Sequence, residues 1–174
     1  YDEAVAALRS GMQAAFTEMS KLRHDTAVAK IPHVVAHIKA ALEEDDGGKI
    51  ICFAHHHDVV HALEVELAEA QPAVLTGEIT SMAARQAAVD RFQTDPACRV
   101  FLGSITAAGV GITLTASSHV IFAELSWVPG DISQAEDRAH RIGQENMVNI
   151  QHLVLEGSLD ATMAKRLVAK QQVI

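Results

Sequence analysis

Two arginines stand three positions apart in the polar stretch QAEDRAHRIGQ, which begins at Gln134. On a helix of 3.6 residues per turn, Gln134, Arg138 and Arg141 are spaced i, i+4 and i+7, so their side chains share one stripe. A guanidinium group is always charged and matches phosphate oxygens two at a time. The stripe therefore indicates a pair of arginines that contact phosphate. The alternative is two surface ion pairs with Glu136 and Asp137, which is the common arrangement for arginines on a helix surface.

The residues around this stripe predict a short helix. Ser133 with Glu136 three positions later is the pattern of a capping box, and Gly143 suits the position just after a helix ends. Three apolar residues repeat the spacing on a neighbouring stripe, namely Ala135, Ala139 and Ile142. The helix is therefore expected to bury one face and to present both guanidinium groups on another.

Composition and charge limit the classes of protein that the chain can represent. Its 174 residues, 49% of them hydrophobic, suffice for one globular domain with a substantial core. No apolar run reaches the ~18 residues of a membrane-spanning helix, and no signal-peptide pattern is present. Cys52 and Cys98 lie in apolar runs typical of buried thiols, so an intracellular location is expected: cytoplasm or nucleoid in a bacterium, nucleus in a eukaryote. The net charge of -8 argues against a free-standing, non-specific nucleic-acid binder.

The order of helical and apolar segments predicts an α/β fold. Residues 1–45 have the period of helices, with a break expected near Asp25 and with Pro32 early in the second helix. Short continuous apolar runs then alternate with helical stretches, which is typical of a parallel sheet covered on both faces. The expected strands are 49–54, 72–76, 99–103, 119–123 and 148–155. The helices expected between the first three strands run from Asp58 to about Ala70 and, capped by Thr80 or Ser81, from about Met82 to Phe92.

The segment after the third expected strand has the composition of an anion-binding loop. Ser104, Thr106, Gly109 and Gly111 would place hydroxyls and unhindered backbone N–H groups at the carboxyl end of a strand, where ligands bind in such sheets. A tight turn is the alternative explanation for the two glycines. The chain has no GxxxxGK[ST] loop and no acidic pair after a strand that would hold Mg²⁺. These residues therefore predict half of a nucleotide site.

Four histidines cluster after the first expected strand: His55, His56, His57 and His61. A structural zinc site would need further ligands, and the preceding Cys52 is expected to point into the core. We therefore expect no metal here, and a loop between a strand and a helix that faces DNA or solvent.

The quoted stretches resemble a known family. QAEDRAHRIGQ resembles motif VI of the Swi/Snf-type ATPases in helicase superfamily 2. LGSITAAGVGITLTASSHVIFAELSWVP is similar to their motif V and the segment that follows it, and KIICFAHH is similar to motif IV. TGEITSMAARQAAVDRF resembles the motif between IV and V, and EGSLDATMAKRLVAKQQ the closing helix of the same lobe. The stretches FAHH and AELSWVPGDISQAEDRAHRIGQ most resemble the annealing-helicase (HARP-like) branch.

The resemblance implies the second RecA-like lobe of a two-lobe DNA translocase. The implied fold is a three-layer α/β sandwich with a mostly parallel sheet over residues 46–174, preceded by a helical segment in residues 1–45. In the family, the first lobe carries the phosphate loop and the Mg²⁺ ligands for ATP, and the second lobe supplies arginine fingers. Carried over by position, the fingers are Arg138 and Arg141, and the other nucleotide-binding residues are Gln134, Gly109 and Gly111. The implied contacts with the DNA backbone are Ser104, Thr106, Gly77, Arg85 and His55.

The implied partners are the DNA backbone, without sequence preference, and the N-terminal ATPase lobe of the same chain. Without that lobe, the residues present here are expected to be inactive. One alternative of a different class stays open, a non-catalytic α/β module that docks DNA or a protein partner. A phosphate loop and an acidic Mg²⁺ motif upstream in the gene would distinguish the ATPase lobe from such a module.

Overall fold

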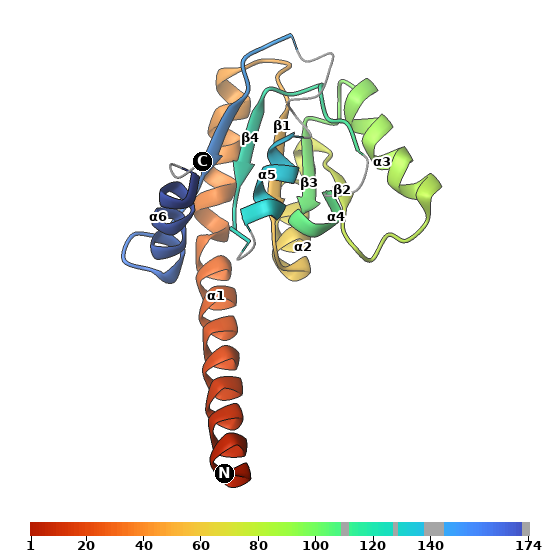
Figure 1. Cartoon of the computed structure of the whole chain (residues 1–174). Helices are drawn as coiled ribbons and strands as arrows, with labels where there is room; N and C mark the ends of the chain where they lie inside the picture. Colours follow the sequence, from red (N-terminus) through yellow and green to blue (C-terminus); the bar gives the residue numbers. More distant parts are fainter. Residues whose placement is uncertain (109–111, 127–128, 138–144, 172–174) are drawn as a thin grey trace.

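A single sheet organises the chain and directs the segments of interest to a common edge (Figure 1). The computed structural model describes residues 1–108, 112–126, 129–137 and 145–171. Within them, the strand order is β2-β3-β1-β4-β5, and every neighbouring pair is parallel. The strands are β1 (Ile50–Ala54), β2 (Ala73–Leu75), β3 (Val100–Ser104), β4 (His119–Phe122) and β5 (Asn149–His152). The prediction of an α/β fold with a parallel sheet is confirmed.

Helices cover both faces of this sheet. The helices α1 (Asp2–Glu44) and α2 (His57–Glu66) pack on one face, and α3 (Met82–Thr94) and α5 (Pro129–Asp137) contribute to the core on the other. The remaining described helices are the 3₁₀ turn Ala68–Ala70, α4 (Ile105–Ala108) and α6 (Leu159–Gln171). In Figure 1, α6 lies beside α1, and the two helices are in contact. The result is the expected three-layer RecA-like sandwich.

Alternate residues of the central strands supply the two halves of the core. Ile51 and Phe53 of β1 pack in the cluster that contains Phe92 of α3. Cys52, between them in sequence, packs in the cluster that contains Ile38 of α1. Successive side chains of a strand point to opposite faces, so a strand buried on both sides is apolar at every position. This explains why continuous apolar runs identified the strands.

The first helix differs from the prediction. α1 runs without interruption, so the break expected near Asp25 is wrong. Thr26 keeps the helical geometry there and donates from Oγ1 to the carbonyl of Leu22 at 2.8 Å. Pro32 lies inside the helix although it has no N–H for the carbonyl four residues earlier. Packing of the later turns against the sheet supplies the stabilisation that local propensity lacks.

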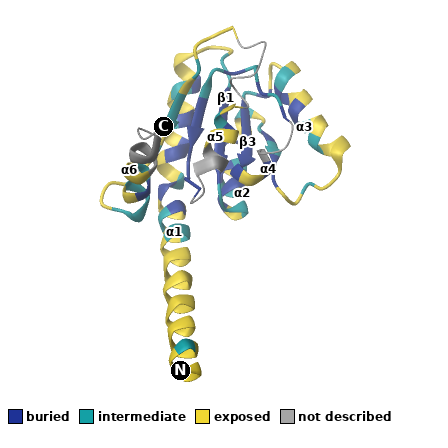
Figure 2. Ribbon diagram, viewed as in Figure 1, coloured by how far each residue is buried: buried dark blue, intermediate teal, exposed yellow. Residues whose placement is uncertain are grey.

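The two halves of α1 have different surroundings (Figure 2). The buried residues of α1 begin at Ala27 and continue to Leu42, and this half packs in the core. Before it, large apolar side chains are exposed, including Leu8 (66%), Met12 (66%) and Phe16 (69%). The amino-terminal half therefore projects beyond the sheet.

Most other boundaries agree with the prediction within a few residues. α3 begins at Met82, and the Oγ of Ser81 accepts from the N–H of Ala84 at 3.4 Å, as expected for an N-cap. α2 begins one residue before Asp58, and β5 ends three residues before the predicted strand does. None of the described helices combines the length and the apolar character that crossing a bilayer requires.

Removing a buried side chain from α1 should destabilise the fold, whereas removing an exposed one should not. Ile38 is fully buried, so we expect Ile38→Ala to lower the free energy of unfolding by about 2–5 kcal/mol. Leu8 lies on the projecting half, and Leu8→Ala should stay within about 0.5 kcal/mol of the wild type. Urea denaturation followed by circular dichroism measures both. Equal losses would mean that the projecting half contributes to the packed core.

The ion pair between α1 and α6 should matter more than a surface pair. Lys30 is 3% exposed, and its Nζ donates to the Asp160 carboxylate and, at 2.9 Å, to the carbonyl of Leu153. We expect Lys30→Ala to cost about 3–5 kcal/mol, because it leaves a poorly solvated carboxylate without its partner. The double variant Lys30→Met/Asp160→Leu should recover most of this loss, since no charge remains to be desolvated. Wild-type stability of Lys30→Ala in the same denaturation assay would contradict a role for this pair.

Candidate functional site

The candidate site lies at the carboxyl edge of the sheet. All described strands run in one direction, so the segments that follow β1, β2, β3 and β4 leave from the same edge. These segments contain the residues predicted to contact DNA and the start of the helix predicted to carry the arginines. Ligands bind at this edge in open parallel sheets.

A buried carboxylate fixes the loop after β1. Glu124 lies two residues after the end of β4 and is 4% exposed. Its Oε2 accepts from the backbone N–H groups of His55 (2.8 Å) and His56 (2.9 Å), and its Oε1 lies 2.6 Å from His56 Nδ1. Burial alone would raise the pKa of the Glu124 carboxyl, but the hydrogen bonds from the His56 side chain and from both N–H groups outweigh it and lower the pKa. The predicted DNA contact His55 therefore lies in a loop that Glu124 holds.

The loop after β2 packs against α2. An added Cβ at Gly77 would lie 3.8 Å from the His57 ring, so these two positions are neighbours. Glu78 pairs with His61 Nε2 at 2.9 Å and with His57 Nδ1 at 3.7 Å. Hydrogen bonds to Glu78 and Glu64 raise the pKa of His61. The predicted DNA contact Gly77 is thus beside the histidine cluster.

Arg85 joins two segments of the edge instead of presenting its whole guanidinium to a ligand. Its Nη1 donates to the carbonyl of Ile79 at 3.2 Å, and its Nη2 donates to the carbonyl of Ala107 at 2.7 Å. The first carbonyl belongs to the loop after β2 and the second to α4, after β3. Arg85 therefore fixes the spacing of these two segments.

The two hydroxyls at the end of β3 and in α4 are presented differently. Thr106 in α4 is exposed. Ser104 is fully buried, and its Oγ accepts from the N–H of Ala107 at 3.3 Å. Ser104 in this arrangement caps the start of α4 and does not present its hydroxyl at the surface.

The helix that begins the arginine motif starts earlier than predicted. α5 begins at Pro129, so the capping box expected at Ser133 is wrong. Proline suits the first helical position because its missing N–H has no partner there, and the helix can begin before the serine. Ser133 and Gln134 are exposed, and Ala135 is fully buried. The exposed position of Gln134 and the buried position of Ala135 agree with the predicted division of the helix into two faces.

Several predicted site residues lie outside the described residues. They are Arg138, Arg141, Gly109 and Gly111, together with Ala139, Ile142 and Gly143 of the predicted helix. Glu136, proposed as an ion-pair partner for the arginines, lies 3.3 Å from His152 Nε2 through its Oε1. That contact ties the described part of α5 to β5.

Three histidines of the cluster, His56, His57 and His61, pair with carboxylates, as does a histidine of α1. His24 of α1 pairs with Asp58, and this hydrogen bond raises the pKa of His24 and lowers that of Asp58. Together with the pairs of His56 and His61, this arrangement uses the imidazoles in polar contacts between elements. In the part of the chain that the structure describes, no group of three or more His, Cys, Asp or Glu side chains is arranged to hold a metal ion.

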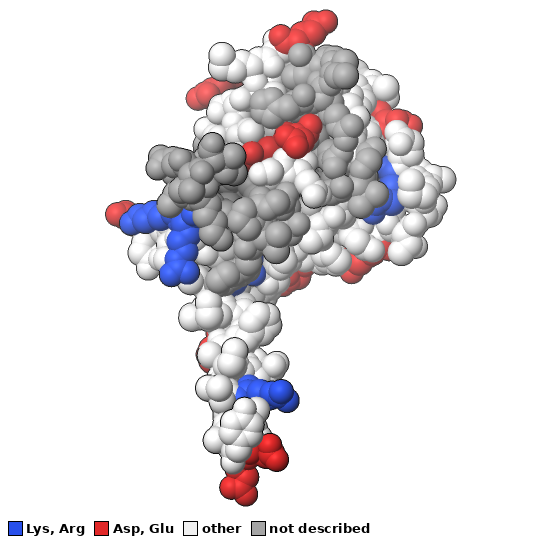
Figure 3. Space-filling model, in the orientation of Figure 1, with Lys and Arg blue, Asp and Glu red and all other residues white. Residues whose placement is uncertain are grey.

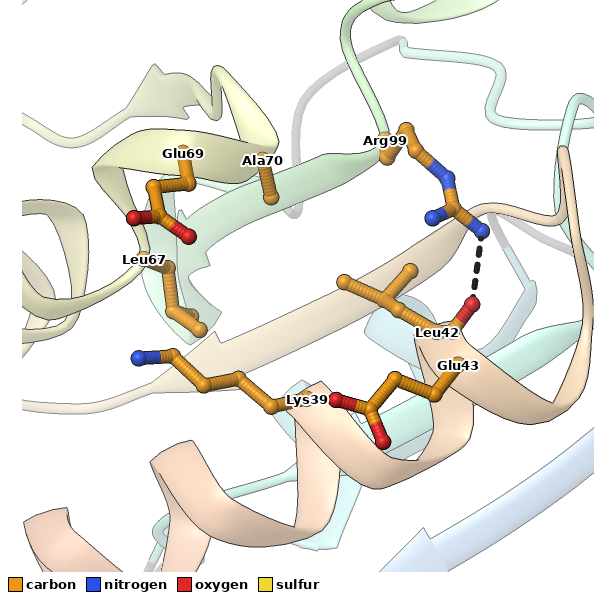
Figure 4. Close-up of a pocket in the computed structure, with 7 residues that line it drawn as sticks. All are labelled: Lys39, Leu42, Glu43, Leu67, Glu69, Ala70 and Arg99. Carbon is orange, nitrogen blue, oxygen red and sulfur yellow. Dashed lines mark hydrogen bonds between the residues drawn. The ribbon is translucent and has the colours of Figure 1, made fainter.

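A pocket of about 260 Å³ lies at the opposite edge of the sheet (Figure 4). Its lining includes Lys39 and Glu43 of α1, Glu69 and Arg99, which precedes β3. Arg99 donates from Nη2 to the carbonyl of Leu42 at 3.0 Å, so it serves to tie the end of α1 to the start of β3. The residues predicted to bind nucleotide or DNA do not line this pocket.

Positive charge is sparse on the visible surface. In Figure 3, the Lys and Arg side chains lie in separate groups, over α6, on the projecting part of α1 and near α3. The net charge of -8 favours a few localised phosphate contacts over a broad basic surface.

Comparisons with known proteins place the chain in a family. Residues 30–143 match the family described as helicase conserved C-terminal domain. The DNA annealing helicase and endonuclease ZRANB3 of mouse is 44% identical over 157 residues, which are 89% of this chain and 14% of that protein. The SWI/SNF-related matrix-associated actin-dependent regulator of chromatin subfamily A-like protein 1 homolog of Caenorhabditis elegans is 42% identical over 141 residues, 79% of this chain and 20% of that protein.

A solved structure agrees with these sequence matches. The C-terminal part of the Fun30 ATPase domain superposes with a TM-score of 0.68 at 32% identity, over 75% of this chain and 43% of that one. The chain spans only a small share of the length of the curated relatives that it matches. The matched range covers more than half of the chain and includes the QAEDRAHRIGQ stretch to its Gly143. The predicted resemblance is thus confirmed: the chain is similar to an annealing helicase and to a SWI/SNF-related protein, and it belongs to the helicase conserved C-terminal domain family.

Proposed function

We propose that this chain acts as the second ATPase lobe of a DNA-dependent translocase, and that a first lobe of the same protein completes the site. The observation that carries the proposal is the convergence of four segments at one sheet edge. They are the segments that resemble motif IV, the motif after it, motif V and the start of motif VI. A hydrolase that couples ATP to DNA needs its nucleotide and DNA contacts on connected elements, and the convergence of these segments supports a site of that kind.

The nucleotide side of the proposed site is the helix that begins as α5. Within α5, Ala135 is buried and Gln134 is exposed, so the side of the helix that carries Gln134 faces away from the core. Arg138 and Arg141, on the same stripe by spacing, would stabilise the charge that develops on the γ-phosphate. Backbone N–H groups at Gly109 and Gly111 would contact the nucleotide. ATP bound with Mg²⁺ supplies the phosphoanhydride that water cleaves, and we assign the phosphate loop and the metal ligands to the first lobe.

The DNA side of the proposed site is formed by the loops after β1, β2 and β3. Exposed Thr106 and the backbone at Gly77 would contact phosphates, which fix register without reading sequence. His55 would contribute through its side chain, because its N–H donates to Glu124. Arg85 and Ser104 would act by holding these segments, because their polar atoms bind the backbone of the edge. We therefore propose a non-sequence-specific DNA backbone contact and an intracellular site of action. We also propose residues 46–174 as the lobe and residues 1–45 as the helical segment leading into it.

The chain alone should not hydrolyse ATP. It lacks a phosphate loop and a pair of acidic Mg²⁺ ligands, so nucleotide bound by this lobe would have no activated γ-phosphate. We expect phosphate release by the purified chain at the rate of buffer, with or without duplex or forked DNA. DNA-stimulated turnover that co-purifies with the chain through two columns would contradict the proposal of half a site.

Removing either arginine should slow chemistry far more than it weakens ATP binding, because a finger acts on charge that develops in the transition state. In the full-length protein, we expect Arg138→Ala and Arg141→Ala to lower kcat by on the order of 10³-fold. Lysine should rescue little, since a point charge does not reproduce the planar fork. Single-turnover hydrolysis and fluorescent-nucleotide binding separate the two effects.

Arg91→Ala provides a matched control for these variants. Arg91 donates to the carbonyls of Gln71 and Pro72 on another part of the surface, and its loss should leave the turnover rate near that of the wild type. Near-normal DNA-stimulated turnover in both finger variants would reduce Arg138 and Arg141 to surface ion pairs and favour the non-catalytic module.

A further inference from the structure

Glu124 is a buried charged residue that the proposed nucleotide and DNA contacts do not use. It is 4% exposed at the carboxyl edge, and its two oxygens have three hydrogen-bond partners in the loop after β1. An isolated buried carboxylate would be costly, so these three contacts are what makes its position tolerable. The same contacts fix the backbone of His55 and His56.

The position of Glu124 joins the ends of two neighbouring strands. β1 and β4 pair in parallel, and Ala123 N–H donates to the carbonyl of Phe53 at 2.8 Å just before Glu124. The loop after β1 leads to the proposed DNA contact at His55, and the segment after β4 leads to α5. Glu124 therefore lies where the proposed DNA and nucleotide sides of the edge meet.

The helix α1 contacts the same junction from outside. Arg23 Nη2 donates to the carbonyl of Leu125 at 2.7 Å, next to Glu124. The His24 ring lies edge-on to the His56 ring with a centroid separation of 4.9 Å, and His24 also pairs with Asp58. Three elements that are distant in sequence thus meet around one carboxylate.

We propose that Glu124 is a positioning residue that holds the loop after β1 at a fixed distance from the segment leading to α5. The loop after β1 would hold DNA, and the segment leading to α5 would bring the helix to the nucleotide. The spacing between DNA and nucleotide then stays constant, which coupled turnover requires. This inference rests on the proposed function, because it assigns the spacing a role in DNA-stimulated ATP hydrolysis.

Three substitutions separate the hydrogen-bond geometry from the charge. In Glu124→Gln, the amide oxygen can accept from both backbone N–H groups, and the amide nitrogen can donate to His56 Nδ1 when the ring proton is on Nε2. Glu124→Asp keeps the charge but is one methylene shorter. Glu124→Ala removes every contact and leaves two backbone N–H groups without their acceptor.

In the full-length protein, Gln should behave nearly as the wild type, whereas Asp and Ala should be impaired. We expect both impaired variants to need a higher DNA concentration for half-maximal stimulation. The ratio of kcat to that DNA concentration should fall by up to about 100-fold, which is the loss expected when a contacting group is misplaced by about 1 Å. The KM for ATP should stay unchanged, because the first lobe holds most of the nucleotide. A merely structural defect would not separate the DNA and ATP parameters in this way.

Ser117→Ala is the matched control at the opposite ends of the same two strands. Ser117 is 5% exposed, donates from Oγ to the carbonyl of Lys49 at 2.5 Å, and accepts from the N–H of His119 at 3.0 Å. This variant loses buried polar contacts between the starts of β1 and β4. We expect it to lower stability and to leave the DNA concentration for half-maximal stimulation unchanged.

Amide hydrogen exchange in the full-length protein, without ATP or DNA, tests whether Glu124 holds the loop after β1, independently of activity. The amides of His55 and His56 should be protected in the wild type, in Glu124→Gln and in Ser117→Ala, and should exchange faster in Glu124→Asp and Glu124→Ala. If Glu124→Ala does not fold, the comparison of Gln with Asp still decides between geometry and charge.

Several results would overturn the inference. Protected amides in Glu124→Asp and Glu124→Ala would show that Glu124 does not hold the loop. Fast exchange with normal DNA dependence would show that the loop position does not matter for turnover. An active Asp variant with an impaired Gln variant would assign the effect to charge. A wild-type protein without DNA-stimulated hydrolysis would contradict the proposed function. The exchange measurements would still show whether Glu124 holds the loop after β1.

Discussion

The common direction of the strands is the constraint on which the rest of this structure depends. A parallel pair cannot be closed by a tight turn, so each connection crosses back over the sheet, and helices occupy both faces. The faces are then unavailable to solvent, and the strand residues become apolar on both sides, as in β1. What remains accessible is the two edges at which the strands begin and end. The residues that we propose to contact ligands lie at the second of these edges, at the ends of β1, β2, β3 and β4 and in the segments that follow them.

This constraint also explains why so many polar side chains of the edge bind backbone groups. Segments that leave a buried sheet carry N–H and C=O groups that need partners. Arg85 satisfies carbonyls of two such segments, Ser104 accepts from the start of α4, and Glu124 accepts from the loop after β1. These contacts hold the segments in fixed relative positions, while Thr106 is exposed at the surface.

Sequence patterns predicted the sheet well because the strands are buried on both faces, and burial of this kind leaves a continuous apolar run. They predicted α1 less well, because its continuity past Asp25 depends on packing against the sheet, and local helix propensity does not include such packing. The predicted start of α5 was wrong because serine is a common N-cap residue, so Ser133 was chosen, whereas the helix already begins at Pro129. Glu124 was missed altogether. An acid after the apolar run HVIFA was a visible signal, but its partners lie about seventy positions away and appear only in the fold.

The helix α1 passes from exposed to packed turns at the junction around Glu124. Its projecting half exposes apolar side chains, while its later turns are packed in the core. Arg23 and His24 lie at the transition between these halves, and they contact the carbonyl of Leu125 and the carboxylate of Asp58. The elements that meet there are the same ones that Glu124 joins, and the position of α1 is therefore linked to the spacing of the edge through direct contacts.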